Sequence, residues 1–371
     1  MKILVLCYEY PPIGGGGGRV AKTVAEALAR RGHEVRVQTA ALGLRSQHEQ
    51  IDGVDVYRTA SGRRVPDTCR VHEMGLYCAT SLRPTLRHLR EWKPDIMHAH
   101  FAMPTGLLAW TVHQITKVPY VLTAHLGDVP GGVPEQTDKL FRFIGPLAKS
   151  VWRNAAAATA VSSFVQRLAE AAYDRKVERV LNGIDLHDSN PPSAPGEIRK
   201  LVFVGRFNPQ KCPDFLIDVL AGLPSDRWQA TLVGDGPVMP AVRTKISKHG
   251  LADRVRLTGW LDTAQVESIL RESDVFLMPS TSEGLPVAAI EALKQGLAVV
   301  ASDIPGILDV VDHGANGLLL PVQDQAAWTK SLADLLQNTP ELNTFKLASW
   351  QKAREFDLTH IVDQYEAILS L

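Results

Sequence analysis

The sequence has few cysteines, no long apolar run and no net charge. Four cysteines in 371 residues show no CxxC or other zinc-type spacing, so neither a zinc site nor a disulfide framework is indicated and reduced thiols are expected. No apolar run approaches the roughly 20 residues that a membrane-spanning helix needs. The apolar start, Met1–Cys7, is too short for a signal peptide. We therefore expect a soluble, cytoplasmic protein.

Two common nucleotide-binding signatures are also missing. The loop Pro11–Arg19 contains five consecutive glycines, but no GxGxxG register fits it, and the strand-like run that ends at Gln38–Ala40 lacks the acid that would hold a ribose. No Gly-Lys-Ser/Thr follows the glycines, so a Walker loop is excluded. A nicotinamide oxidoreductase is thus disfavoured. The chain also lacks a D-x-D metal motif, and we expect no metal and no cofactor.

The neutral net charge hides an uneven distribution. Residues 1–185 carry 24 Lys+Arg and 17 Asp+Glu, a balance of +7, whereas residues 186–371 carry 16 and 23, a balance of −7. A basic half suits an anionic acceptor or acidic lipid headgroups, and we expect no nucleic-acid partner. Arg83, Arg87, Arg90 and Lys93 recur at helical spacing and would share one face. A solvated surface helix is the alternative interpretation of that face.

Apolar strand-like runs alternate with amphipathic segments along the whole chain, which favours parallel sheets covered by helices on both faces. The fold class is therefore α/β, with two doubly wound parallel-sheet domains. The polar, proline-rich stretch 186–196 is the best linker. We predict an N-terminal domain over 1–190, a C-terminal domain over 191–355 and a terminal helix over 356–371. Thirteen runs are predicted as strands: 3–7, 35–39, 54–59, 95–98, 120–123, 156–161, 177–181, 201–204, 229–233, 255–258, 275–279, 298–301 and 317–320.

The segment Ser282–Gly296 joins a buried strand to a helix. Proline is tolerated in the first helical turn, so Pro286 marks the start of that helix, and Gly296 marks its end. Glu283 then lies at the helix mouth, where backbone N–H groups and the helix dipole favour a phosphate. Glu291 lies about a turn and a half into the helix, which has a rise of about 1.5 Å per residue. A capped helix with two solvated glutamates is the alternative.

Two further loops follow strand-like runs in the same half. The first contains Gly205, Arg206 and Lys211, and its guanidinium and ammonium groups suit phosphate oxygens. Such cations would stabilise the negative charge that grows on a departing diphosphate. The second loop, Gly234–Pro237, is a tight strand-to-helix turn.

Histidines end two strand-like runs in the N-terminal half. His98 and His100 are alternate residues of one strand, so they share a face and suggest a metal pair, but no third ligand is evident. His125 and Asp128 follow the next strand. Two strand ends that offer histidines to the same sheet edge favour a ligand-binding role over a purely structural one.

Together these motifs resemble the retaining, sugar-nucleotide-dependent glycosyltransferases of the GT-B fold, family 4, over nearly the whole chain. The resemblance implies two Rossmann-like domains that face each other across a cleft, with the nucleotide in the second. It implies catalytic roles for His125, Arg206, Lys211 and Glu283, and acceptor-side roles for Arg19 and His100. Donor-binding residues implied by the resemblance are Gly15, Gly16, Gly17, Asp128, Gly205, Gly234, Asp235, Gly236, Arg256, Leu257, Gly284, Leu285, Pro286 and Glu291. Cys212 departs from the family, in which a glycine often follows the lysine.

The implied activity is transfer of a sugar, with retention, from a nucleotide-diphosphate sugar to a hydroxyl of a saccharide or lipid-linked acceptor. UDP is favoured over GDP, and the leaving phosphate would accept the proton in a metal-independent front-face mechanism. The basic half could associate peripherally with an anionic membrane at its inner face. Two alternatives stay open: a nucleotide-sugar epimerase or hydrolase of similar fold, and a non-catalytic sugar-nucleotide-binding protein. The segment Val129–Lys139 has no assigned role.

Overall fold

The computed structural model describes residues 1–66, 68–224 and 227–371, and of residues 134–143 it describes the backbone alone. The chain forms two compact units, Met1–Gly183 with Leu358–Leu371, and Ile184–Asp357. The predicted boundaries at 190 and 355 thus lie close to the observed changes of unit. The proline-rich stretch belongs to the second unit because it packs there. The Ser189 hydroxyl donates to the Lys294 carbonyl at 3.0 Å and accepts from the Trp350 indole at 2.9 Å.

The N-terminal unit contains an eight-stranded sheet in the order β3-β4-β2-β1-β5-β6-β7-β8. The pairs are parallel except for β3 and β4, which are antiparallel. The strands are β1 Lys2–Leu6, β2 Glu34–Leu42, β3 Gln47–Ile51, β4 Val54–Arg63, β5 Ile96–His100, β6 Tyr120–Ala124, β7 Ala157–Ala160 and β8 Glu178–Arg179.

Strand β3 is the described strand that the sequence analysis missed. Its residues are polar and largely exposed, so it lacks the apolar run that identifies the other strands. Asp52 and Gly53 join it to β4 with φ values of 50° and 82°. Positive φ at both central residues is the geometry of a type I′ hairpin turn, and the Asp-Gly pair is the sequence signal that identifies it.

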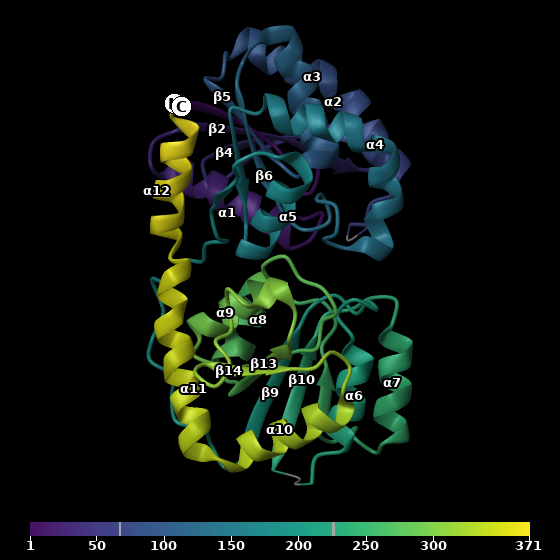
Figure 1. Cartoon of the computed structure of the whole chain (residues 1–371), viewed down its shortest axis with the longest axis vertical. Helices are drawn as coiled ribbons and strands as arrows, with labels where there is room; N and C mark the ends of the chain where they lie inside the picture. Colours follow the sequence, from purple (N-terminus) through teal and green to yellow (C-terminus); the bar gives the residue numbers. More distant parts are fainter. Residues whose placement is uncertain (67, 225–226) are drawn as a thin grey trace. The chain divides into compact units, whose positions relative to one another are not determined.

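The helices of the N-terminal unit are α1 Gly16–Arg30, α2 Val71–Glu91, α3 Leu107–Thr116, α4 Pro134–Asn154, α5 Ser163–Tyr173 and α12 Leu358–Leu369, with a short helical turn, η1, over Ala102–Gly106. The terminal helix α12 packs beside α1 (Figure 1). Its buried side chains recur at helical spacing, from Leu358 to Leu369. Arg31 at the end of α1 holds it further, with a 2.7 Å ion pair to Asp363 and a 2.8 Å bond to the Thr359 carbonyl.

The C-terminal unit contains a six-stranded parallel sheet in the order β11-β10-β9-β12-β13-β14. Its strands are β9 Arg199–Val204, β10 Trp228–Val233, β11 Val255–Leu257, β12 Val275–Met278, β13 Ala298–Ser302 and β14 Gly317–Leu320. Its helices are α6 Pro213–Ala221, α7 Met239–Lys248, α8 Thr263–Arg271, α9 Val287–Lys294, α10 Gln325–Gln337 and α11 Thr339–Lys352, with short turns η2 Pro305–Ile307 and η3 Ala353–Phe356.

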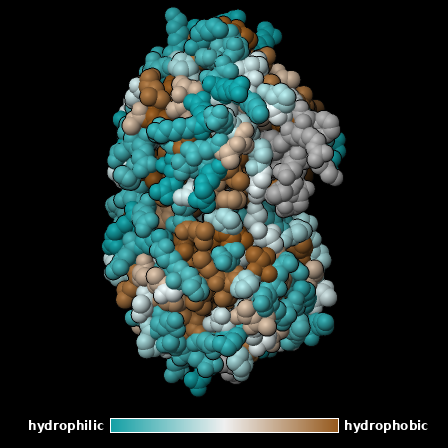
Figure 2. All heavy atoms as spheres, viewed as in Figure 1, coloured by the Kyte–Doolittle hydropathy of each residue, from teal (hydrophilic) through white to brown (hydrophobic). Residues whose placement is uncertain are grey.

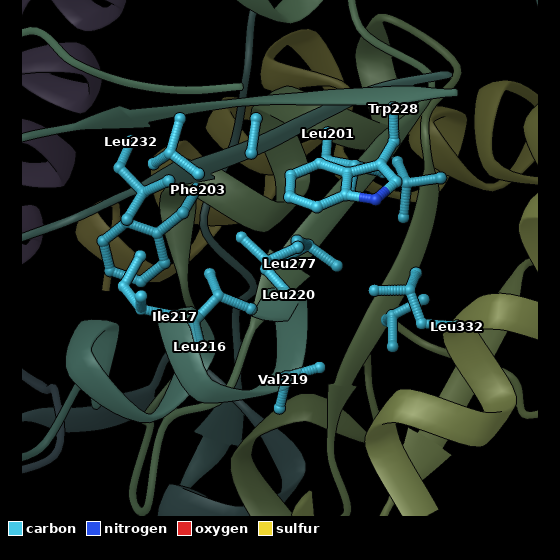
Figure 3. Packing of buried hydrophobic residues seen from close by; sticks show 14 of the residues in the cluster. Leu201, Phe203, Leu216, Ile217, Val219, Leu220, Trp228, Leu232, Leu277 and Leu332 are labelled. Atoms are coloured by element: carbon cyan, nitrogen blue, oxygen red, sulfur yellow. The ribbon is translucent and has the colours of Figure 1, made fainter. Parts of the chain in front are cut away.

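The helices of the C-terminal unit form two layers around its sheet. Helix α6 contacts both α7 and α10 in one group, and α9 contacts both α8 and α11 in the other (Figure 1). Side chains of β9, β10, α6 and α10 interdigitate between the sheet and one layer, among them Phe203, Leu216, Trp228 and Leu332 (Figure 3). Apolar burial of this extent is the main force that holds such a unit together.

The surface is mostly hydrophilic on the face drawn in Figure 2, with a hydrophobic area on the C-terminal unit. The large apolar side chains exposed on that unit include Trp260 and Leu308, at 58% and 48%. Across the described part of the chain, no helix combines the length and the hydropathy that crossing a membrane would require.

Both sheets reverse their strand order at a defined point. In the C-terminal unit the reversal lies between β9 and β12, and in the N-terminal unit between β1 and β5. Ligands of open α/β sheets bind beyond the carboxyl ends of the strands at such points. The loops after β9 and β12, and those after β1 and β5, are therefore the places where chemistry is expected.

Candidate active site

In the C-terminal unit, the loops after β9 and β12 bring a cation and a carboxylate together. The Nζ atom of Lys211 lies 2.5 Å from Oε1 of Glu283, and their side chains are 23% and 8% exposed. A charge-assisted bond this short between partly buried groups is stronger than a surface ion pair. The two predicted catalytic residues thus form one unit at the strand-order reversal.

Backbone bonds join the same two loops. The Thr281 N–H donates to the Gln210 carbonyl at 2.8 Å, and the Gln210 side chain donates to the Ser282 carbonyl at 2.7 Å. The Lys211 N–H in turn donates to the Asn208 side chain at 3.0 Å. The position of the pair is therefore set by the backbone as well as by charge.

Glycines let the surrounding backbone approach closely. A Cβ atom on Gly234, which has a φ of 130°, would lie 1.9 Å from the Gly205 carbonyl oxygen. One on Gly306 would lie 1.7 Å from the backbone carbonyl oxygen of Glu283. No side chain fits at such distances. Asp235 lies in the same turn: its carbonyl accepts from the Phe207 N–H at 2.9 Å, and its carboxylate accepts from the next N–H at 2.6 Å. The structure thus gives Asp235 a turn-forming role.

Cys212, which stands where a glycine often follows the lysine, adopts the backbone conformation of a glycine. It has a φ of 47° and a ψ of 45°, the left-handed conformation that favours glycine, and it caps the start of α6. Its thiol lies 2.9 Å from the Pro209 carbonyl, to which it donates, and accepts from the Gln323 amide at 3.5 Å. The loop therefore keeps the glycine-type shape although a side chain is present.

The other residues predicted in this half lie on the same loops or close to them. Gly284 and Leu285 are buried directly before α9, and Pro286 is the residue at which that helix is capped. Glu291 is half-buried in α9, and Arg206 is half-buried directly after Gly205. Their contacts with a donor stay predictions.

Arg256 and Leu257 lie apart from this cluster. Both belong to β11 at the edge of the sheet, where Leu257 packs against the apolar core. Arg256 is exposed and lines a hollow together with Lys200, Gln229 and Glu272, residues that lie towards the amino-terminal half of the sheet or beside it. Arg256 thus lines a hollow that includes neither Lys211 nor Glu283, and its contact with the base of a donor stays a prediction.

In the N-terminal unit, Glu9 holds the glycine loop that follows β1. Its carboxylate accepts from the Gly15 N–H at 3.1 Å, and its carbonyl oxygen lies 2.0 Å from the position of a Cβ on Gly18. The buried guanidinium of Arg63 supports the segment with 3.1 Å bonds to the carbonyls of Val65 and Pro66. Gly15, Gly16 and Gly17 then open α1, with Arg19 in its first turn.

His125 lies beside this loop. A Cβ atom on Gly17 would lie 3.1 Å from its Nδ1 atom and 2.5 Å from the ring of Phe101. Phe101 has a φ of 72°, and its ring centre is 4.4 Å from that of His125. Phe101 and Glu9 are site residues that the sequence analysis missed. An aromatic residue directly after the His98–His100 pattern is the signal that identifies Phe101.

Asp128 binds the backbone in this structure. Its two carboxylate oxygens accept from the N–H groups of His125 and Ala102, at 2.9 Å and 2.7 Å, and so join the ends of β6 and β5. Burial raises the pKa of Asp128 to about 6, although these backbone bonds act in the opposite direction. These bonds give Asp128 a role in shaping the His125 loop, and its predicted donor contact stays a prediction.

His98 and His100 are fully buried. Nε2 of His98 lies 2.7 Å from the Thr123 hydroxyl, and Nδ1 of His100 lies 3.3 Å from Nε2 of His125. His100 is thus enclosed in this structure, and its predicted acceptor-side contact stays a prediction. Within the described residues, no group of three or more His, Cys, Asp or Glu side chains is arranged to hold a metal ion.

The segment Val129–Lys139 falls partly outside the described side chains. Val129 and Val133 are buried, and Pro134 opens α4. The side chains of Pro134–Lys139 lie outside the described part, so this segment keeps no assigned role.

Comparisons with known proteins connect both units to one family. Residues 14–188 match the model described as Glycosyltransferase Family 4, and residues 198–338 match that described as Glycosyl transferases group 1. The chain is 30% identical over 295 residues to a Bacillus subtilis glycosyltransferase whose name assigns it to teichuronic acid biosynthesis. The matched region covers 76% of this chain and 72% of that protein.

Solved structures show the same fold. Sucrose-phosphate synthase from Thermosynechococcus elongatus superposes with a TM-score of 0.84 at 20% identity, covering 99% of this chain and 98% of that one. The Anabaena protein HepE, solved in complex with UDP and glucose, superposes with a TM-score of 0.78 at 22% identity, covering 100% and 99%. The chain therefore belongs to glycosyltransferase family 4 and is a glycosyltransferase of the GT-B fold.

Proposed function

We propose that this enzyme transfers a sugar, with retention of anomeric configuration, from a nucleotide-diphosphate sugar to a hydroxyl group of an acceptor. The observation that carries the proposal is the Lys211–Glu283 pair at the carboxyl ends of β9 and β12. A cation and a hydroxyl-binding carboxylate side by side match the two ends of the bond that breaks, the diphosphate and the sugar. UDP is the proposed nucleotide, and the HepE complex with UDP and glucose supports it.

Each proposed role follows from the chemistry of the group. Lys211 and Arg206 would stabilise the charge that develops on the departing diphosphate, and Glu283 would bind hydroxyls of the transferred sugar. Glu291 would bind the ribose, and His125 would bind the sugar from the N-terminal unit. The leaving phosphate would accept the proton of the acceptor hydroxyl, so that the protein mainly positions the reactants and stabilises charge. We propose that no metal is required.

The acceptor is proposed to be a saccharide or a lipid-linked saccharide. The exposed side chains of Arg83, Arg87 and Arg90 on α2 support an anionic partner. Leu44 and Val71 are 77% and 63% exposed, and each has an arginine as its chain neighbour. Apolar and basic side chains together suit the surface of an anionic membrane, at which the enzyme would act from the cytoplasmic side.

The proposal is tested in two steps with the purified chain. A thermal-shift panel of nucleotide sugars identifies the donor, because a ligand that binds the folded state raises the melting temperature. The donor is then incubated with and without candidate acceptors, with and without EDTA, and the anomeric configuration of the product is read by NMR. A retained configuration formed only with an acceptor, and unaffected by EDTA, is expected.

Other outcomes overturn parts of the proposal. An inverted product contradicts retention, and loss of transfer with EDTA contradicts metal independence. Donor conversion without an acceptor indicates an epimerase or hydrolase, and donor binding without turnover over a broad acceptor panel indicates a binding protein. Sedimentation with vesicles of anionic or neutral lipid tests the membrane contact, and equal binding to both contradicts it.

A further inference from the structure

His100 and His125 are joined ring to ring behind the glycine loop. Nδ1 of His100 and Nε2 of His125 are 3.3 Å apart, and the rings are 0% and 7% exposed. The second nitrogen of His125, Nδ1, faces Gly17, where it lies 3.1 Å from the position of a Cβ. His100 thus contacts the hidden edge of His125, and the opposite edge is directed at the glycine loop.

The tautomer of one ring fixes that of the other, because the two rings share a hydrogen bond. Burial lowers the pKa of His125 to about 3 and that of His100 well below its ordinary value, so both rings are neutral at neutral pH. A neutral imidazole has one N–H and one bare nitrogen. In the first arrangement, His100 donates from Nδ1 and His125 carries its proton on Nδ1. In the second, His125 donates from Nε2 and its Nδ1 is an acceptor.

The surroundings of His100 favour the first arrangement. Its other nitrogen, Nε2, is buried and has no hydrogen-bond partner among the residues that the structure describes. The second arrangement would place an N–H group at this atom without an acceptor, whereas the first leaves only a bare nitrogen there. Buried N–H groups without a partner are rarer than under-satisfied acceptors. The proton of His100 therefore belongs on Nδ1.

His98 supports this assignment by holding the His100 ring in place. The two ring centres are 4.3 Å apart, and Nε2 of His98 lies 2.7 Å from the Thr123 hydroxyl, which lies 2.8 Å from that of Thr159. The ring of Tyr365, from α12, is 5.2 Å from that of His98. A packed wall of this kind restricts rotation of His100 and keeps its Nδ1 directed at His125.

We propose that His100 is a positioning residue that holds His125 in the tautomer with its proton on Nδ1, so that His125 presents a hydrogen-bond donor over Gly17. The group that receives this bond would be an oxygen of the transferred sugar, a part of the proposal that rests on the proposed function. In this state the Nδ1 atom of His125 acts as a donor and not as a base. His100 contributes to transfer without touching a substrate.

The tautomer is measured directly by NMR of the whole chain with ¹⁵N-labelled histidine. The ring ¹⁵N shifts and couplings distinguish a proton on Nδ1 from one on Nε2, and a His125→Gln variant assigns the signal. We expect the Nδ1–H tautomer of His125 in the wild type at pH 7. In His100→Leu, which removes the donor, we expect the Nε2–H tautomer to appear. His100→Asn, whose side-chain amide can replace the Nδ1–H donor, is expected to restore the wild-type form.

Kinetics then test the link to transfer. We expect His100→Leu to lower kcat by about tenfold, the loss of one hydrogen bond, with little change in the KM of the donor, and His100→Asn to recover most of it. His113→Asn is the matched control, since this partly buried histidine of α3 bonds the Val118 carbonyl and lies outside the cluster. Its kcat and the His125 signal are expected to stay unchanged.

The outcomes separate the two proposals. An Nε2–H tautomer of His125 in the wild type overturns the inference, whatever the enzyme transfers. An unchanged tautomer and kcat in His100→Leu also overturns it. If His100→Leu does not fold, the wild-type spectrum and His100→Asn still decide. The expected tautomer in a protein that transfers no sugar supports the histidine arrangement and contradicts the proposed function alone.

Discussion

Lys211 and Glu283 are 72 positions apart in the chain, yet the Lys211 ammonium lies 2.5 Å from the Glu283 carboxylate. Each residue lies in the loop that follows the carboxyl end of a strand, and the two strands are neighbours at the point where the sheet reverses its order. Parallel strands bring such ends to one edge, so the pairing is a consequence of topology and not of sequence proximity.

Removing either member of this pair should abolish most of the activity. We expect Lys211→Ala and Glu283→Gln each to lower kcat/KM by about 100-fold or more, the loss typical of one group that stabilises charge in the transition state. Lys211→Ala should also weaken UDP binding in calorimetry.

Lys245→Ala is the matched control for that experiment. Lys245 has a similar side-chain exposure, 29%, and pairs with Asp218 at 2.6 Å, but joins α7 to α6 away from the strand ends. Its kcat/KM is expected to be that of the wild type. Near-native transfer by Lys211→Ala or by Glu283→Gln would refute the role of the altered residue.

The glycine loop should not tolerate a methyl group at position 17. In Gly17→Ala the new Cβ would lie 2.5 Å from the Phe101 ring, which must shift and displace the His125 ring beside it. We expect at least a tenfold lower kcat/KM, with cooperative thermal unfolding retained. Gly75→Ala, in α2, has no neighbour within 4 Å of its Cβ and should behave as the wild type. Equal rates for the two variants would show that this loop does not position His125.

A buried ion pair supports the C-terminal unit. Nζ of Lys346, in α11, lies 2.7 Å from the Asp274 carboxylate, and both side chains are nearly inaccessible, at 3% and 8%. Lys346→Met leaves a buried carboxylate without its cation, so we expect the free energy of unfolding to fall by about 3–5 kcal/mol in urea titrations.

Two companions test that interpretation. In Lys346→Met/Asp274→Asn the buried charge is gone, and much of the lost stability should return. Lys330→Met breaks an exposed pair with Asp334, where the side chains are 81% and 68% exposed, and should cost less than about 1 kcal/mol. A double variant as unstable as the single one would contradict the charge argument.

Acid should destabilise the N-terminal unit through its buried histidines. Burial lowers the pKa of His98 to about 3, whereas in the unfolded chain it is near the ordinary 6.5. The unfolded state therefore binds more protons than the folded state below about pH 6.5. The contribution of each such histidine to the free energy of unfolding is fully present above that pH. It is lost as the pH falls towards 3, by about 1.4 kcal/mol per pH unit. Asp128 acts oppositely, since its pKa is raised to about 6 and the folded state takes up its proton first.

His98→Gln isolates one such term, because the glutamine amide can keep the bond to Thr123. Between pH 6 and pH 4, the unfolding free energy of this variant should fall less steeply than that of the wild type, by about 1.4 kcal/mol per pH unit. Denaturant titrations at a series of pH values measure the slopes. His187→Gln, at a side chain that is 87% exposed, is the control. A wild-type slope in His98→Gln would show that His98 is not the group that titrates.

Much of the fold could be predicted from local pattern. Each of the thirteen predicted strands coincides with an observed one, because buried parallel strands are short apolar runs bounded by turn residues. Strand β3 was missed because a hairpin at the sheet edge is polar, and the boundary at 190 was placed late because the proline-rich stretch packs on the second unit. Neither composition nor periodicity contains that packing.

The site divides in the same way. Lys211, Glu283 and His125 were predicted because strand-end cations, carboxylates and histidines follow recognisable motifs. The structure shows what the sequence does not for two of their neighbours: both oxygens of Asp128 accept from backbone N–H groups, and His100 is fully buried. A sequence lists the residues of a loop but not which of their atoms are already bonded, so direct ligand contacts were predicted for both.

The sequence by itself determined the class of the protein, since alternating apolar runs specify doubly wound sheets and three strand-end motifs specify the family. The tertiary structure alone decided which motif residues meet, which of them are enclosed, and that a non-glycine residue, Cys212, keeps the left-handed turn after Lys211. The physical reason is that periodicity and turn chemistry act over a few neighbouring residues. Burial and pairing depend instead on strands that are distant in the chain and adjacent in the sheet.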